Sequence, residues 1–147
     1  MSARHRALRF ALPHVLWQQA AQAVPAAGLQ VTPSGRIDTV DGAESIRQAI
    51  LMLVSTVPGE RVMRPDYGCS LYRVVFSPND DTTAGLAIHY VRTALERWEP
   101  RIDIISLDAT RDDNEPGRLY VLLNYRVRAT QSVERIELPV ELTGEAA

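Results

Sequence analysis

Apolar residues recur every three or four positions between residues 42 and 57, which is the spacing of one buried face of an α-helix. The positions on this face are Ile46, Ile50, Leu53, Val54 and Val57. Asp41 and Glu44 stand at the spacing of a capping box, so we expect Asp41 to accept from a first-turn amide while Glu44 reaches back. Pro58-Gly59 should end the helix, because a proline forces the residue before it out of the α region.

A second helical pattern follows the polar run at residues 77–81 and ends at Trp98. Its apolar stripe consists of Ala87, Tyr90, Val91, Ala94, Leu95 and Trp98. Either Asp80 or Asp81 is expected to cap the first turn of this helix with its carboxylate.

Beyond residue 101 the apolar period changes from 3.6 to 2, the period of a β-strand. Residues 102–108 alternate with one slip at Ile104-Ile105, which indicates a β-bulge. Residues 119–129 form a longer alternating run, bounded by turn signals at 111–117 and 131–132. Two helices followed by three strands predict an α+β fold, with two main helices packed on a small antiparallel sheet and a C-terminal edge strand.

The last predicted strand alternates apolar residues with Glu137, Pro139 and Glu141. Its apolar positions are Ile136, Leu138, Val140 and Leu142. Pro139 has no backbone N–H to donate, which suits an edge strand. The proline and its flanking glutamates are consistent with a device against uncontrolled pairing, and equally with an edge reserved for one partner strand.

Residues 1–30 are rich in Ala and Gln, so we divide the chain into an N-terminal arm, residues 1–30, and one domain, residues 31–147. The spacing of Leu8, Leu12, Val15 and Leu16 predicts a short amphipathic helix in the arm, with Pro13 at a boundary or kink. The arm is interpreted either as a weakly ordered tail or as a segment that docks on a partner.

Composition narrows the class of protein further. The 147 residues are 46% apolar and 23% charged, a balance typical of a globular domain, and no stretch is apolar enough for a membrane span. The formal net charge of −2 argues against a nucleic-acid partner. All sixteen basic residues are arginines, which suit fixed pairing with carboxylates at protein interfaces. The single cysteine, Cys69, forms no internal disulfide, and we expect a cytoplasmic protein.

Candidate chemistry is sparse. The three histidines lack metal-ligand spacing, so we expect no metal and no cofactor. Glu60, Asp66 and Glu99 could supply the paired carboxylates of a glycosidase. Each has an arginine nearby in sequence, however, which would hold it ionised and spoil a general acid. Structural or interface ion pairs are therefore preferred, and we expect no enzyme.

Two motifs carry a family resemblance. The run Pro-Gly-Glu-Arg-Val-Met-Arg-Pro-Asp-Tyr-Gly-Cys spans residues 58–69, and Trp-Glu-Pro-Arg-Ile spans residues 98–102. Together they resemble the baseplate-wedge, or sheath-initiator, family of contractile phage tails and injection systems. The residues of the first motif that we single out are Gly59, Glu60, Arg61, Met63, Arg64, Pro65, Tyr67 and Gly68. Most of them are expected to serve the loop itself, with positive φ at the glycines, a Glu60–Arg61 pair and a buried Tyr67.

The resemblance implies a structural baseplate component of a phage-tail-like contractile particle. Such a subunit would link the wedge to the inner tube and hub, and would initiate the sheath by exchanging a strand along Ile136, Leu138, Val140 and Leu142. Its expected partners are wedge, sheath and tube proteins, with six copies in a particle assembled in the cytoplasm and no direct membrane insertion.

In this family Glu99, Pro100 and Arg101 would contact the core bundle of the wedge, with both charges projecting from a rigid corner toward the partner. The alternatives are a peptidoglycan-cleaving, lysozyme-like enzyme, or the equivalent subunit of a type VI secretion system or a phage.

Overall fold

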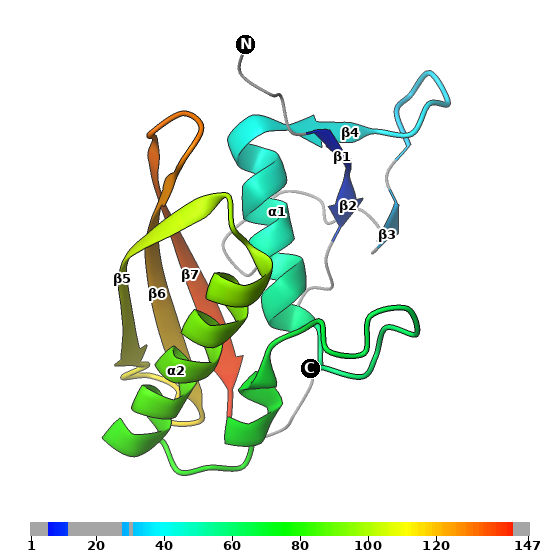
Figure 1. Ribbon diagram of the computed structural model, residues 1–147. Helices are drawn as coiled ribbons and strands as arrows, with labels where there is room; N and C mark the ends of the chain where they lie inside the picture. The colour runs from blue at the N-terminus through cyan, green and yellow to red at the C-terminus, as the bar shows by residue number, and fades with distance from the viewer. Residues whose placement is uncertain (1–5, 12–27, 30, 143–147) are drawn as a thin grey trace.

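The computed structural model describes residues 6–11, 28–29 and 31–142. Within these residues, two α-helices pack on one face of a three-stranded antiparallel sheet, and short strands lie beside the start of the first helix (Figure 1). The elements are β1 (Arg6–Leu8), β2 (Phe10–Ala11), β3 (Gly28–Leu29), β4 (Thr39–Asp41), α1 (Gly42–Ser55), the 3-10 helix η2 (Ser70–Val74), α2 (Asp81–Trp98), β5 (Ile102–Arg111), β6 (Arg118–Val127) and β7 (Val133–Glu141). The predicted α+β class is confirmed.

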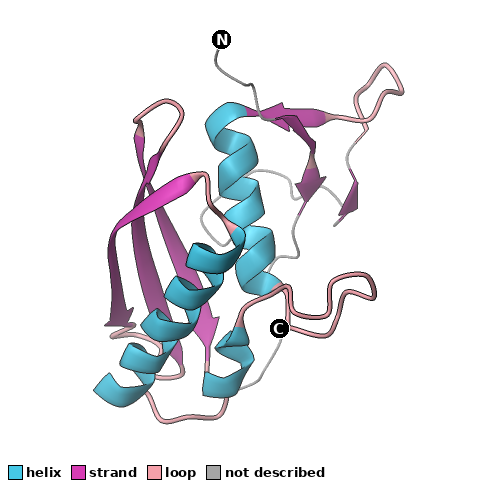
Figure 2. Cartoon of the chain, viewed as in Figure 1, coloured by secondary structure: helices cyan, strands magenta, loops and turns pink. Residues whose placement is uncertain are grey.

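The three-stranded sheet has the order β5-β6-β7. Alternate residues of β6 are wholly buried against the helices, as the period of 2 predicts. The register of β5 on β6 shifts between Ile104 and Ser106, which confirms the predicted bulge. Figure 2 shows both helices on the same side of this sheet, so one apolar layer between them forms the core.

Strand β7 lies at one side of the sheet, so the predicted edge position is confirmed. The four apolar side chains of the last run point into the core and are buried: Ile136, Leu138, Val140 and Leu142. A partner strand that pairs with β7 would therefore meet its backbone and not these side chains.

The two helix starts differ from each other. Asp80 caps α2, and its carboxylate accepts from the Thr83 N–H at 2.8 Å. The capping box predicted for α1 is wrong, because the Asp41 side chain makes no capping bond. Glu44 instead accepts two hydrogen bonds from the guanidinium of Arg9, 35 residues earlier in the chain.

The described part of the arm is extended, so the helix predicted to begin near Leu8 is wrong for residues 6–11. Strand β1 pairs antiparallel with β4, and β2 pairs with β3. Arg9 bridges Asp38 and Glu44, and Gln48 of α1 donates to the Leu8 carbonyl at 2.7 Å. These long-range bonds override the local helical spacing. Leu12, Val15 and Leu16 lie outside the described residues, and the division at residue 30 stays a prediction.

Candidate assembly interfaces

The motif loop, residues 58–69, folds back on itself through its backbone. The Gly59 N–H donates to the Pro65 carbonyl at 2.7 Å, which closes the loop at its base. The Cys69 N–H donates to the Thr56 carbonyl at 2.8 Å and joins the end of the loop to the end of α1. The Glu60 carboxylate accepts from the Val57 N–H at 3.1 Å. The segment is thus an ordered structure, despite its content of glycine and proline.

Gly68 is the position in this loop that tolerates no side chain. Its φ of +139° lies in a region that other residues rarely adopt, and an added Cβ would stand 2.5 Å from the Thr56 carbonyl oxygen. Gly59 also has a positive φ, but nothing lies within 4 Å of the place its Cβ would take. The predicted positive φ is confirmed for both glycines, and Gly68 additionally permits a close approach of two backbone segments.

Aromatic and cationic side chains fasten the motif loop to the end of α2. The guanidinium of Arg61 lies 4.3 Å from the centroid of the Tyr67 ring. Tyr67 meets Trp98 edge-on with ring centroids 5.4 Å apart, and Arg97 lies 4.9 Å from the Trp98 centroid. Burial raises the pKa of Tyr67, and the nearby Arg61 partly opposes the shift. This cation–π stack replaces the Glu60–Arg61 pair that we expected.

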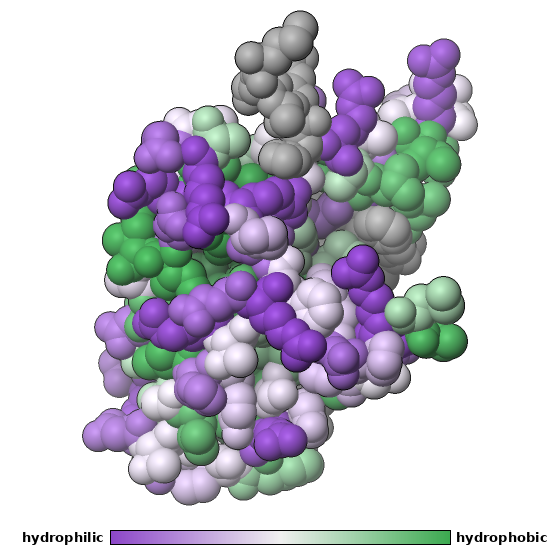
Figure 3. Space-filling model, in the orientation of Figure 1, coloured by the Kyte–Doolittle hydropathy of each residue, from purple (hydrophilic) through white to green (hydrophobic). Residues whose placement is uncertain are grey.

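The tip of the motif loop presents apolar side chains to solvent. Val62 is 94% exposed and Met63 is 91% exposed. Figure 3 shows this tip as a hydrophobic protrusion on the side of the molecule where the loop leaves the C-terminal end of α1. The neighbouring Arg64 and Pro65 are exposed as well, so the loop projects while its base is held.

The Glu-Pro-Arg corner, residues 99–101, follows α2 directly. Arg101 donates through Nε and Nη2 to the two carboxylate oxygens of Glu99, at 2.6 and 2.8 Å. The Glu99 side chain is 5% exposed and that of Arg101 is 29% exposed. Bonding to Glu99 raises the pKa of Arg101.

The expectation that both charges of the corner project toward a partner is therefore wrong. Glu99 is buried and paired with Arg101, because a buried carboxylate needs a compensating charge close by. Only Arg101 and the bend at Pro100 remain accessible to a neighbouring protein. The contact of this corner with a wedge stays a prediction.

The hydrogen bonds at the two ends of the β6–β7 pair show which backbone groups of β7 face β6 and which face the open edge. The Val127 N–H donates to the Ser132 carbonyl, and the Leu142 N–H donates to the Gly117 carbonyl. Since backbone groups alternate in direction along a strand, the even-numbered residues of β7 face β6. The backbones facing the open edge belong to Val133, Arg135, Glu137, Pro139 and Glu141.

Two features limit this open edge. Arg47 of α1 donates to the Arg135 carbonyl at 3.1 Å, which occupies one of its acceptors. Pro139 contributes a carbonyl but no donor.

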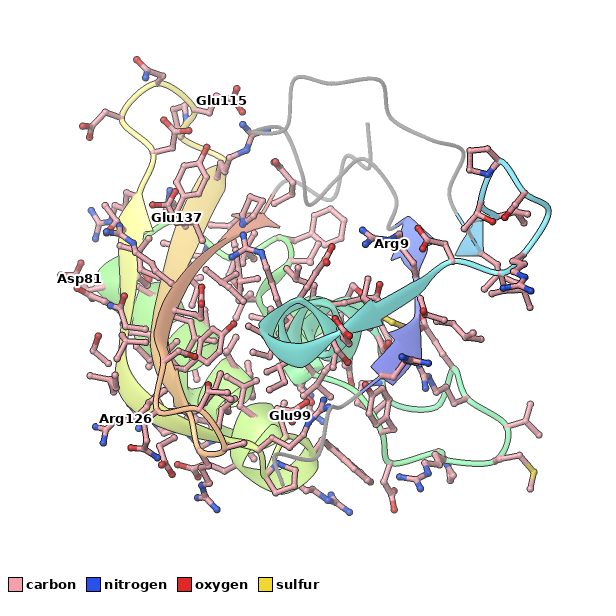
Figure 4. The ribbon with its side chains drawn as sticks, turned by 90° about the horizontal axis from the view of Figure 1, so that it is seen from above. Arg9, Asp81, Glu99, Glu115, Arg126 and Glu137 are labelled. Carbon is pink, nitrogen blue, oxygen red and sulfur yellow. The ribbon has the colours of Figure 1, made fainter. Side chains whose placement is uncertain are left out.

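Figure 4 shows Glu137 at the sheet and Glu99 near the end of α2, well separated on the molecule. The corner and the edge are thus two distinct candidate interfaces.

A hollow of about 540 Å³ opens between β1, α1 and the motif loop. Its walls carry three arginines, Arg6, Arg61 and Arg101, and no carboxylate. Sequence reasoning missed this site, because Arg6 is far in sequence from Arg61 and Arg101 and joins them through strand β1, which pairs with β4. The stack of Arg97 and Trp98 on the motif loop was also missed, because Tyr67 and Trp98 are far apart in sequence.

The described residues contain no group of three or more metal-ligating side chains. Each carboxylate that we considered for catalysis is engaged elsewhere: Glu60 by the Val57 N–H, Asp66 by Arg97 at 3.7 Å and Glu99 by Arg101. Burial raises the pKa of the Cys69 thiol to about 11, which makes it a poor nucleophile. In the part of the chain described, no helix is both long and apolar enough to cross a membrane.

These features describe an assembly module: an α+β core that holds a rigid loop, a bend and an open strand edge. A family model described as "Baseplate wedge protein gp25" matches residues 40–132, which include the motif loop and the Glu-Pro-Arg corner. The chain belongs to this family, and it is accordingly a structural baseplate component of contractile, tail-like particles.

Two phage relatives agree with the family match. Baseplate protein W of Escherichia phage P2 is 30% identical over 102 residues, which cover 69% of this chain and 87% of that protein. Baseplate wedge protein gp25 of Enterobacteria phage T4 is 30% identical over 67 residues, 46% of this chain. The chain spans only about half, 51%, of the T4 protein.

Solved structures share the fold. A crystal structure from Geobacter sulfurreducens, named as a candidate tail lysozyme, has 40% identity and a TM-score of 0.64, and the match covers 71% of this chain and 93% of that one. A chain of the postcontracted baseplate of Pyocin R2 has 28% identity and a TM-score of 0.53, with coverage of 68% and 96%.

Proposed function

We propose that this chain is the baseplate subunit on which the sheath begins, and that it receives a sheath strand along the open edge of β7. The observation that carries the proposal is that the side chains and the backbone of β7 serve different contacts. Its core-facing side chains fix the strand to the domain, while alternate backbone groups point away from β6. An extended segment can add to such an edge without disturbing the core.

The edge is selective as well as open. Pro139 removes one donor, and Arg47 occupies the Arg135 carbonyl, so a matching strand has few positions at which to pair. Glu137 is exposed and, among the described residues, pairs only with Arg135 on the same strand, and a charged side chain of this kind at an edge discourages pairing with an arbitrary strand. This combination reconciles the two interpretations of Pro139, because an edge protected against most strands can still be reserved for one.

We assign the wedge contact to the bend at Pro100 and the exposed side of Arg101. The Glu99 carboxylate fixes the Arg101 guanidinium in one orientation, so a partner meets a preorganised cation. We also place the tube or hub near this module and expect six copies per particle. These expectations come from the family resemblance and from no single contact in the chain.

Catalysis is the second candidate function, suggested by the name of the Geobacter sulfurreducens protein. Glu60, Asp66 and Glu99 are each held by a donor or a cation, and none of them lines the basic hollow. A general acid must be open to its substrate. We therefore propose a structural role without hydrolysis. Release of peptidoglycan fragments by the purified chain, abolished by Glu99→Gln, would contradict this.

The test of strand exchange is Glu137→Pro, compared with Glu137→Ala. The proline removes one N–H from the open edge and leaves the β6–β7 ladder intact, because Glu137 faces away from β6. We expect Glu137→Pro to yield baseplates that lack sheath, and Glu137→Ala to yield sheathed particles. Both outcomes are scored by negative-stain electron microscopy of particles from the native producer.

Deletion of residues 133–147 is a poorer test, since it removes four buried core side chains and would unfold the domain. Normal sheaths on Glu137→Pro particles would contradict pairing at this edge. Loss of the baseplates themselves in the Glu137→Ala variant would point to a role for the side chain and not for the backbone.

A further inference from the structure

The basic hollow brings together parts of the chain that are far apart in sequence. Strand β1 supplies Arg6, Ala7 and Leu8, and α1 supplies Ser45, Gln48, Ala49 and Met52. The motif loop supplies Arg61 and Tyr67, and the Glu-Pro-Arg corner supplies Arg101. Strand β1 lies outside residues 40–132, the range that the family model matches.

The charges around the hollow are unbalanced. The whole chain has a net charge of −2, yet the hollow is lined by three arginines and no acidic residue. Nε and Nη2 of Arg101 are used by Glu99, which leaves Nη1 outside that pair. The Arg61 guanidinium lies over the Tyr67 ring, and stacking of this kind leaves the in-plane N–H groups available to a planar carboxylate.

Four residues of the lining beside the arginines are apolar, namely Ala7, Leu8, Ala49 and Met52, and the uncharged Ser45, Gln48 and Tyr67 complete it. A volume of about 540 Å³ accommodates several side chains of a bound segment. The site is built firmly, because Gln48 ties β1 to α1 and the cation–π stack ties the motif loop to α2. Charge complementarity therefore selects a segment with a carboxylate flanked by apolar side chains.

We propose that β1 and the Glu-Pro-Arg corner form a single docking site for an acidic segment of a neighbouring baseplate protein. The proposal rests on the proposed function, since it requires that the chain be built into a baseplate. It assigns to the N-terminal strand a direct part in recognition, with Arg6 as the third cation of the site. The two family motifs alone would supply only two of the three arginines, Arg61 and Arg101.

The first experiment compares three variants of the full chain, each co-expressed with the other baseplate proteins of its particle and recovered through a tag. Arg6→Glu should reduce the recovery of one baseplate protein about tenfold, because it places a negative charge opposite a carboxylate. Arg6→Lys keeps the charge and should retain most of the recovery. Arg36→Glu makes the same charge change at an exposed position outside the hollow and should have no effect.

Circular dichroism and thermal melting of the purified variants separate loss of docking from loss of folding. Recovery of the baseplate protein by Arg6→Glu at the wild-type level would overturn the docking site and leave the proposed function standing. Failure of the wild-type chain to recover any baseplate protein would instead count against the proposed function itself. A fall in recovery with Arg36→Glu equal to that with Arg6→Glu would show a general charge effect and also overturn the site.

The second experiment identifies the occupant. A photo-crosslinking benzoylphenylalanine replaces Leu8, a partly exposed residue of the lining, and the crosslinked peptide is sequenced by mass spectrometry. The expected peptide comes from a baseplate protein and contains Asp or Glu. A peptide without an acidic residue would overturn the charge argument. Crosslinking to residues 143–147 of the same chain would show that the protein fills its own hollow, which overturns docking of a partner.

Discussion

The Glu-Pro-Arg corner and the β7 edge, the two proposed interfaces, differ in which groups they expose. At the corner, side chains carry the chemistry, and the buried Glu99 holds Arg101 in place. At the edge, the apolar side chains are buried and alternate backbone groups face outward. A site made of side chains can recognise the charge and shape of its partner, whereas a site made of backbone recognises extended conformation. If both proposed interfaces are used, one small domain would bind two different kinds of partner without the sites competing.

The two sites are also supported by different parts of the fold. The corner depends on the motif loop and α2, through the stack of Tyr67 on Trp98. The edge depends on β6 and the helical layer beneath it. A change that weakens one support should leave the other site intact in a domain that still folds, and the following substitutions test this separation in order of expected effect.

Gly68→Ala should be the most damaging single change to the support of the corner. The added methyl would meet the Thr56 carbonyl at 2.5 Å in a backbone conformation unsuited to alanine, so we expect a loss of about 4 kcal/mol in the free energy of unfolding. Gly59→Ala is the matched control, because it has positive φ without a clash, and it should cost about 1 kcal/mol. Urea denaturation measures both. Equal losses would contradict the close backbone approach at Gly68.

Leu138→Ala should be nearly as damaging to the β7 edge. Leu138 is fully buried, and truncation of such a side chain costs about 3 kcal/mol. Its neighbour Glu137 points to solvent on the other face, so Glu137→Ala should change the unfolding free energy by less than about 0.5 kcal/mol. The midpoints of chemical denaturation check the pair. A large loss with Glu137→Ala would mean that the outer face of β7 also carries stability.

Arg101→Ala should destabilise the domain more than Glu99→Ala does. Removal of the arginine leaves a buried carboxylate without its counter-charge, so we expect the free energy of unfolding to fall by about 3 kcal/mol. Removal of Glu99 leaves a cation that can reach water, so we expect a smaller fall of about 2 kcal/mol. Thermal and urea unfolding of the two variants and of the double variant give the coupling between them. Additive losses would show that the corner pair contributes little as a pair.

Asp80→Ala should have the smallest effect of the set, since Asp80 lies at the far end of α2 from the corner. Hydrogen bonds from Thr83 hold the pKa of Asp80 below its usual value. The ionised Asp80 cap therefore contributes its full stabilisation above about pH 4, the pKa of Asp in the unfolded chain. This contribution is lost as pH falls through the lower pKa that Asp80 has in the folded protein.

Asn caps a helix without a charge, so Asp80→Asn is the matched control and should remove this acid dependence while keeping the cap. The melting temperature of wild type and Asp80→Asn, measured from pH 7 down to pH 2, checks the sign. Identical acid profiles for the two proteins would exclude Asp80 as a contributor.

Most elements of the core could be predicted from the chain because their signals are local. The period of 3.6 in α1 and α2, the period of 2 in β6 and β7 and the slip at Ile104-Ile105 each depend on residues within one element. The cap at Asp80 is equally local, and it was confirmed. The capping box at Asp41 failed because Arg9, distant in sequence, binds Glu44 instead.

The sequence by itself determined the α+β class, the edge position of β7 and the two motifs that mark the family. Tertiary structure decided where the charges of those motifs point: Glu99 inward to Arg101, and Arg61 onto Tyr67. It also decided that residues 6–8 form a strand and complete the basic hollow. The physical reason is that periodicity encodes which face of an element is buried, whereas the partner of a charged side chain depends on which distant segments pack beside it.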